Sequence, residues 1–140
     1  LARELFATTQ DAFLMTEDTA EDDACRDTAD GKPATRQYAH ARLARSVCEC
    51  HTQFNPQDTL LFAQQIKARL VSLLDDALKL VIRGMQQPPQ KIILTGHGNF
   101  LADCITLQLP TINLLSRELS RVAPAYAVAV LLEEHLEASH

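Results

Sequence analysis

The chain has 140 residues, of which 46% are hydrophobic and 22% are charged; this is long enough to bury a core and typical of a folded domain. Thirteen Lys and Arg against eighteen Asp and Glu give a net charge of −5, which argues against a nucleic-acid-binding protein. No apolar stretch reaches the roughly eighteen residues of a membrane span, and no signal peptide is recognised at the start, so we expect a cytoplasmic location without membrane contact.

A short strand is predicted over residues 1–6, with a short helix after it. Thr8 or Thr9 is a suitable helix cap, and Asp11 then lies in the first turn, near the positive end of the helix. Residues 16–33 lose the apolar pattern and are rich in Asp, Thr, Ala and Gly. A loop of this length is uncommon inside a compact domain unless it is functional or disordered.

The next helix is predicted over residues 34–50, where apolar side chains follow helical spacing: Ala39, Leu43, Ala44, Val47 and Cys48. Cys48, Cys50 and His51 lack the paired two-residue spacing of zinc ligands, and the helix places Cys48 on its apolar face, so a structural zinc is not favoured. Without a secretory context, we expect all four cysteines as reduced thiols.

A long helix begins near Asn55, because Asn55, Pro56 and Asp58 supply a cap, a first-turn proline and an early carboxylate in order. Its apolar stripe predicts a core or interface and continues until Gly84 ends it. Roughly thirty residues at about 1.5 Å each give a rod of about 45 Å. Such a rod is expected to kink or to lean against something that is missing from this chain.

The second half of the chain alternates between strands and helices. A buried parallel strand is predicted over 91–95, a helix over 100–107 and a second strand over 111–115. Residues 116–122 are predicted as a polar connection, and Ala123-Pro124 opens a last helix that runs toward His135. This order predicts an α/β sheet with helices on its faces.

Two clusters are candidates for chemistry, and one of them is the turn Gly96-His97-Gly98-Asn99. It leaves the carboxyl end of a predicted strand and enters a helix, where loose N–H groups favour an anion such as a phosphate. The same residues are equally consistent with a tight turn that needs positive φ. The turn is not a P-loop, because no Lys-Ser/Thr pair follows it.

The other cluster lies in the acidic loop. Asp27 and Asp30 are oxygen ligands of the kind that Mg²⁺ prefers, and Lys32 and Arg36 can meet the charge of a phosphate chain. A flexible acidic loop followed by a helix cap explains the same composition. No serine, cysteine or threonine has a recognisable partner for nucleophilic catalysis.

Several stretches together resemble a known family: residues 4–13 (ELFATTQDAF), 27–36 (DTADGKPATR), 94–101 (LTGHGNFL) and 122–127 (VAPAYA). They are similar to segments of the tetrahydromethanopterin-linked one-carbon transfer pathway proteins, relatives of hydantoinase/oxoprolinase and of the archaeal enzyme that makes the methanofuran precursor. The resemblance implies an α/β fold, the helix-rich ribonuclease H-like lobe of the acetate/sugar kinase–heat-shock–actin type. It also implies that residues 1–140 are a single domain, the carboxyl-terminal portion of a larger two-lobed protein.

The archaeal relative joins a furanmethanol diphosphate to a phenol-bearing γ-glutamyltyramine and releases diphosphate. The resemblance therefore implies a transferase in methanofuran-like cofactor synthesis. In it, Mg²⁺ at Asp27 and Asp30 neutralises the departing diphosphate with help from Lys32 and Arg36. The glycine turn corresponds to the nucleotide-side loop of the fold.

Two alternatives stay open. One is an ATP-using enzyme of the hydantoinase/oxoprolinase or kinase kind, which needs its nucleotide at the turn formed by residues 96–99. The other is a non-catalytic module whose acidic loop and long helix serve assembly. In each case the missing amino-terminal lobe of the same protein is an expected partner. This chain alone is expected to be inactive and to form homo-oligomers through the apolar surface that the lobe leaves exposed.

Overall fold

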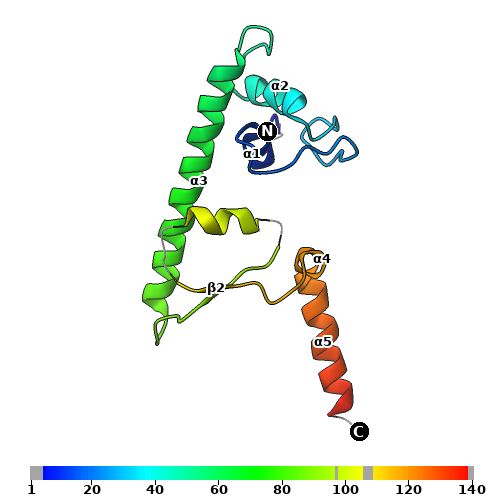
Figure 1. Ribbon diagram of the computed structural model, residues 1–140, viewed down its shortest axis with the longest axis vertical. Helices are drawn as coiled ribbons and strands as arrows, with labels where there is room; N and C mark the ends of the chain where they lie inside the picture. The colour runs from blue at the N-terminus through cyan, green and yellow to red at the C-terminus, as the bar shows by residue number, and fades with distance from the viewer. Residues whose placement is uncertain (1–4, 97, 106–108, 139–140) are drawn as a thin grey trace, which may run out of the picture. The chain divides into compact units, whose positions relative to one another are not determined.

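The computed structural model describes residues 5–96, 98–105 and 109–138 (Figure 1). The chain divides into two compact units, unit 1 (Leu1–Leu73) and unit 2 (Leu74–His140). The long helix α3 (Pro56–Gly84) contributes residues to both. Among the described residues, no helix combines the length and the apolar character that crossing a membrane requires.

Helix α1 (Thr9–Met15) begins after Thr8, whose backbone is extended. The Thr8 N–H donates to Asp11 Oδ2 at 2.8 Å, and the Asp11 N–H donates to the Thr8 carbonyl at 3.1 Å, so a reciprocal pair closes the start of the helix. This confirms the predicted cap. The strand predicted over 1–6 falls mostly outside the described residues, and Leu5 and Phe6 are not in a strand.

Residues 16–35 form the predicted long loop, which is held by its own backbone. Asp22 and Ala34 form an isolated antiparallel bridge, and the Ala34 N–H donates to the Cys25 carbonyl at 3.2 Å. Between these contacts the chain reverses at Gly31, whose φ of +68° lies in the left-handed region that favours glycine. These backbone contacts give the loop a defined conformation.

Unit 1 packs α1, α2 (Arg36–Ser46) and the first half of α3 through small side chains. One buried cluster takes a residue from each helix: Ala12, Leu43 and Ala63. A second cluster holds the end of the loop against α1 and α2: Leu14, Ala34 and Ala39. Because an alanine side chain is a single methyl group, the helix backbones can approach closely at these points.

Helix α2 is shorter than the predicted 34–50, since Thr35 caps it and it ends at Ser46. Cys48 lies beyond the end of the helix, is exposed and has a φ of +60°. Its predicted position on an apolar helical face is therefore wrong. The four cysteines are free thiols.

Helix α3 begins and ends as predicted. Asn55 Oδ1 accepts from the Asp58 N–H at 2.9 Å, and Gly84 is the last helical residue. The connection before α3 is held by His40 of α2, whose Nδ1 lies 2.7 Å from Thr59 Oγ1 and whose Nε2 lies 3.0 Å from the His51 carbonyl oxygen. His40 thus has the packing role that is most common for a histidine on a helix.

Unit 2 has a two-residue parallel ladder where longer strands were predicted. β1 (Ile92–Ile93) pairs with β2 (Thr111–Ile112) in parallel, which confirms the strand direction. Ile93 is 53% exposed, so the prediction of a buried strand over 91–95 is wrong. A 3-10 helix, η1 (Asn99–Cys104), occupies the place of the helix predicted over 100–107, of which residues 106 and 107 lie outside the described residues.

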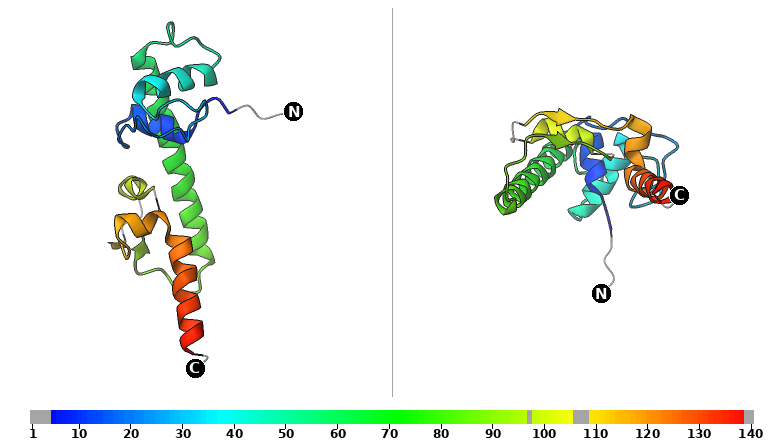
Figure 2. Two further views of the ribbon diagram at one scale, coloured as in Figure 1. Left: turned by 90° about the vertical axis from the view of Figure 1, so that its right-hand side faces the viewer. Right: turned by 90° about the horizontal axis from the view of Figure 1, so that it is seen from below.

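Residues 116–122, predicted as a polar connection, contain the short helix α4 (Arg117–Arg121), so that prediction is wrong. Ser116 Oγ caps it by accepting from the Leu119 N–H at 3.3 Å. Helix α5 (Ala123–Glu137) follows directly (Figure 2). It has the predicted proline in its first turn. No residue of α5 is buried, and its large apolar side chains are exposed: Tyr126, Val128, Leu131, Leu132 and Leu136.

The described elements are mainly helical, with two short parallel strands. The predicted order of strand, helix, strand and helix is present in unit 2 in a reduced form. The ribonuclease H-like lobe stays a prediction, as does the single carboxyl-terminal domain over residues 1–140.

The two glycines at 31 and 84 form a matched pair for testing the loop. An added Cβ meets nothing within 4 Å at either position, but only Gly31 has positive φ. We expect Gly31→Ala to lower the free energy of unfolding by about 1 kcal/mol through backbone strain. Gly84→Ala should leave it unchanged or raise it by about 0.4–1 kcal/mol. Chemical denaturation followed by circular dichroism measures both, and equal effects would contradict the turn at Gly31.

Candidate functional site

Arg42 of α2 is a fully buried charge, with 0% of its surface exposed. Its Nε donates to Asp11 Oδ1 at 2.7 Å, and its Nη1 donates to Asp30 Oδ1 at 3.0 Å and to the Pro33 carbonyl at 3.4 Å. Nη2 lies 2.7 Å from Asp11 Oδ1 but lacks hydrogen-bond geometry. One guanidinium therefore joins α1, the loop and α2.

Asp11 is the buried counter-charge, 1% exposed. Its Oδ2 accepts from the Thr8 N–H at the start of α1, and its Oδ1 accepts from Arg42. Burial lowers the pKa of Arg42, but hydrogen bonds and charge attraction from Asp11 and Asp30 outweigh burial, so the pKa is raised and the guanidinium stays charged.

Asp30 connects this buried pair to the surface, and its side chain is 20% exposed. Oδ1 accepts from Arg42, and Oδ2 accepts from Arg45 Nη2 at 2.6 Å. Burial raises the pKa of Asp30, but hydrogen bonds from Arg45, the Lys32 N–H and Arg42 outweigh it, so the pKa is lowered. Both carboxylate oxygens are thus already engaged with positive groups.

Asp27 and Lys32, also predicted as site residues, lie on the exposed side of the same loop. The Asp27 carboxylate has no hydrogen bond or ion pair with any described residue. The Lys32 ammonium lies 5.5 Å from the centre of the Tyr38 ring. In the described part of the chain, no group of three or more His, Cys, Asp or Glu side chains could hold a metal ion. Mg²⁺ at Asp27 and Asp30 stays a prediction.

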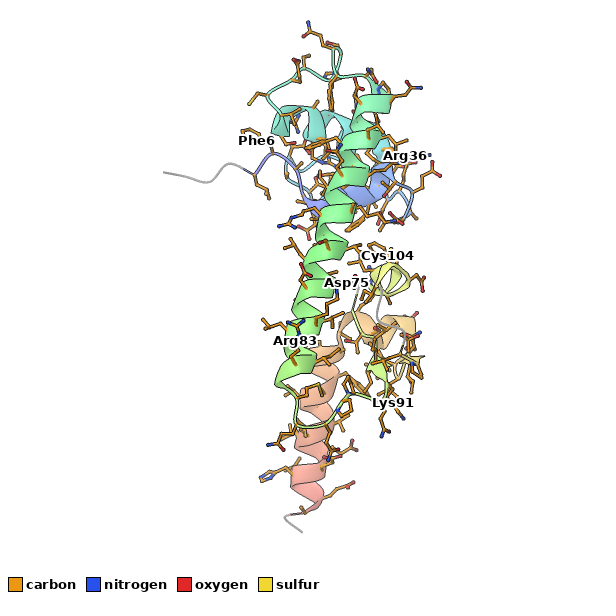
Figure 3. The ribbon with its side chains drawn as sticks, turned by 90° about the vertical axis from the view of Figure 1, so that its left-hand side faces the viewer. Phe6, Arg36, Asp75, Arg83, Lys91 and Cys104 are labelled. Carbon is orange, nitrogen blue, oxygen red and sulfur yellow. The ribbon has the colours of Figure 1, made fainter. Side chains whose placement is uncertain are left out.

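Arg36, predicted to assist phosphate binding, is engaged by acidic residues of the loop. At the start of α2 (Figure 3), its guanidinium pairs with Glu17 and Glu21. Its backbone N–H donates to Glu21 Oε1 at 2.6 Å, which satisfies one of the free donors at the start of α2. Arg36 therefore closes the loop onto the helix and must leave these partners before it can bind an anion.

The glycine turn follows β1 and enters η1, as the sequence predicted. The N–H of Gly96, which has a φ of +99°, donates to the carbonyl and the hydroxyl of buried Ser120 at 3.0 and 2.8 Å. The Gly98 carbonyl accepts from the Leu101 N–H at 2.9 Å. His97 and the side chain of Asn99 lie outside the described residues. The Gly96 amide is thus used within the protein, and ligand binding at this turn stays a prediction.

An open groove of about 410 Å³ lies beside α1 and α3 in unit 1, and none of the residues of the charged network lines it. Its walls are mainly apolar, with Phe62, Ile66 and Leu70 from α3 facing Thr9 from α1. Arg69 is the charged side chain among its lining residues. The groove therefore offers little to a phosphate, and the loop is the better candidate for an anionic ligand.

Sequence reasoning identified Asp30 but missed Arg42 and Arg45, the residues that bind it. A signal for Arg42 is present in the sequence, because it lies three residues after Ala39 and next to Leu43, within the buried stripe of α2. A lone arginine in an apolar stripe needs a buried acceptor. Nothing in the spacing identifies Asp11 and Asp30 as those acceptors.

Almost the whole chain is similar to two curated synthases. The (4-{4-[2-(gamma-L-glutamylamino)ethyl]phenoxymethyl}furan-2-yl)methanamine synthase of Methanococcus vannielii is 26% identical over 147 residues, which cover 99% of this chain and 65% of the relative. The synthase of the same name from Methanocaldococcus jannaschii is 24% identical over 143 residues, which cover 98% of this chain and 42% of the relative. The chain thus spans less than two thirds of each relative. No protein-family model matches it.

The buried ion pair yields a prediction about stability. Arg42→Met leaves the Asp11 carboxylate buried without its counter-charge and should cost about 3–5 kcal/mol of unfolding free energy. Because the two residues interact directly, combining it with Asp11→Asn should cost clearly less than the sum of the single changes. Arg83→Met, at an exposed position of α3, is the control and should change stability by less than about 0.5 kcal/mol. Denaturant unfolding measures all four, and strict additivity would contradict the pairing.

The lowered pKa of Asp30 predicts how stability depends on pH. A carboxylate whose pKa is lowered by folding stabilises the protein above its unfolded value of about 3.9, and this contribution is lost as the pH falls through the folded value. We therefore expect Asp30→Asn to have a lower Tm than the wild type at neutral pH, with the difference shrinking below about pH 4. Thermal unfolding from neutral to acidic pH tests this, with exposed Asp23→Asn as the control. A constant difference would contradict the prediction.

Proposed function

We propose that this chain is part of a transferase that joins a furanmethanol diphosphate to a phenolic acceptor in the synthesis of a methanofuran-like cofactor. The observation that carries the proposal is the alignment of 98–99% of the chain with two synthases. The product in the relatives' name contains an ether between a phenol oxygen and a CH₂ group on a furan ring. Because the chain spans 65% and 42% of these relatives, the activity is proposed for the full-length protein.

The bond changes define what the site must supply. The phenol oxygen forms a bond to the CH₂ carbon, the bond from that carbon to the diphosphate oxygen breaks, and the phenol proton leaves to solvent or a base. The products are the aryl ether and diphosphate. Negative charge builds up on the departing diphosphate, so fixed positive charge near it lowers the barrier.

Two residues of the acidic loop are suited to this task. The Lys32 ammonium is at the surface and can meet a phosphate oxygen. The exposed Asp27 carboxylate is a hard oxygen ligand suited to Mg²⁺, which when bound would neutralise part of the diphosphate charge. Asp30 does not fit as a second ligand in this arrangement, because Arg42 and Arg45 occupy its oxygens.

A nucleotide-using enzyme of the hydantoinase/oxoprolinase or kinase kind is the main rival, and a thermal-shift measurement separates the two. A ligand that binds only the folded protein adds about 2.7 kcal/mol of stability at a hundred times its Kd. With Mg²⁺ present, we expect diphosphate to raise the Tm of the full-length protein. We expect the rise in Tm with ATP to be no larger than binding of its phosphate groups alone would give. A shift specific to ATP would favour the rival, and no shift would favour the assembly module.

The direct test follows diphosphate release from furanmethanol diphosphate and γ-glutamyltyramine by the full-length protein. We expect Asp27→Asn and Lys32→Met each to lower kcat/KM by about tenfold or more, the range for removing charge stabilisation of a transition state. Asp23→Asn, the same chemical change at an exposed position of the same loop, is the matched control and should behave as the wild type. Release of diphosphate without ether formation, or equal effects of all three changes, would refute the proposal.

A further inference from the structure

The loop over residues 16–35 presents two kinds of charged side chain. Asp27 and Lys32 are exposed, whereas both oxygens of Asp30 are bound by arginines. Only the first kind can meet a ligand without breaking an ion pair. The positions of Asp27 and Lys32 nevertheless depend on the backbone around Asp30.

Arg42 holds that backbone. Its Nη1 donates to Asp30 and to the Pro33 carbonyl, which lie on either side of the turn formed by Gly31 and Lys32. Its Nε donates to buried Asp11, so the guanidinium is also anchored to α1. The turn that carries Lys32 is therefore tied at both ends to one enclosed side chain.

The neighbouring positive charges also give Asp27 and Asp30 different roles. A divalent cation at Asp30 would have to displace Arg42 or Arg45, and displacing Arg42 would take an acceptor from a buried guanidinium. Whichever arginine remained would repel the cation. Asp27 has no such partner among the described residues.

We propose that Arg42 is a positioning residue for the diphosphate site, acting through Asp30 and Pro33 on the turn that carries Lys32. Asp30 belongs to this support, and Asp27 is the carboxylate that faces a divalent cation. The inference rests on the proposed function for the identity of the ligand, a diphosphate with its cation. The supporting role of Arg42 for the turn follows from its hydrogen bonds within unit 1.

The test measures diphosphate release by full-length protein across a Mg²⁺ titration. We expect Asp27→Asn to raise the Mg²⁺ concentration for half-maximal rate by about tenfold or more, with an unchanged Tm. Asp30→Asn and Arg42→Lys should instead lower kcat by about tenfold or more at an unchanged Mg²⁺ requirement. Lysine keeps the charge of Arg42 but lacks the planar fork that reaches both Asp11 and Asp30.

An equal rise in the Mg²⁺ requirement of Asp30→Asn would make Asp30 a ligand and overturn the inference. An unchanged kcat in a folded Arg42→Lys protein would overturn it too. Should Arg42→Lys not fold, Asp30→Asn carries the test, because it leaves the Arg42–Asp11 pair in place. Asp23→Asn is the control and should change neither kcat nor the Mg²⁺ requirement.

Hydrogen exchange distinguishes a failure of this inference from a failure of the proposed function. A wild-type protein that releases no diphosphate refutes the function, while the bonded amides of Gly31 and Ala34 still report on the loop. In Asp30→Asn we expect both amides to exchange on the order of tenfold faster, with the amides of α3 unchanged. Unchanged exchange at Gly31 and Ala34 would overturn the positioning role of Arg42.

Discussion

The guanidinium of Arg42 is charged and shielded from water, so the segments around it must supply its acceptors. Asp11 comes from α1, and Asp30 and the Pro33 carbonyl come from the loop. Neither segment can shift against α2 without leaving a charge unpaired in the interior. Such a pair adds little net stability compared with apolar packing, but it penalises wrong arrangements heavily. We therefore interpret it as the contact that selects one arrangement of unit 1.

The rest of unit 1 is consistent with that constraint. Its buried apolar side chains are mostly small: Ala12, Ala34, Ala39, Ala44 and Ala63. Each alanine buries little apolar area, so close packing of the backbones and the charge network share the task of holding the helices and loop together. The same network leaves Asp27 and Lys32 at the surface. Under the proposed function, Arg42 and Asp30 support the loop, whereas Asp27 and Lys32 contact the ligand.

Among the described residues, fewer are buried in unit 2 than in unit 1. Among its described residues, Asp75 and Ser120 are the buried ones, and its ladder has two residues in each strand. The large apolar side chains of α5 are exposed, and no residue of this helix is buried. The sequence therefore predicted the helix correctly, although nothing among the described residues covers its apolar side chains. Self-association and a covering amino-terminal lobe stay predictions.

The sequence by itself determined where α1 and α3 begin, where α3 ends and that α5 opens with proline, because capping groups act within one turn of the chain. It did not determine the lengths of the strands, which depend on partners distant in the chain. Only the tertiary structure decided what Asp30 binds. Arg42 is 31 residues from Asp11 and 12 from Asp30, and no local pattern encodes a meeting of three segments around one buried charge.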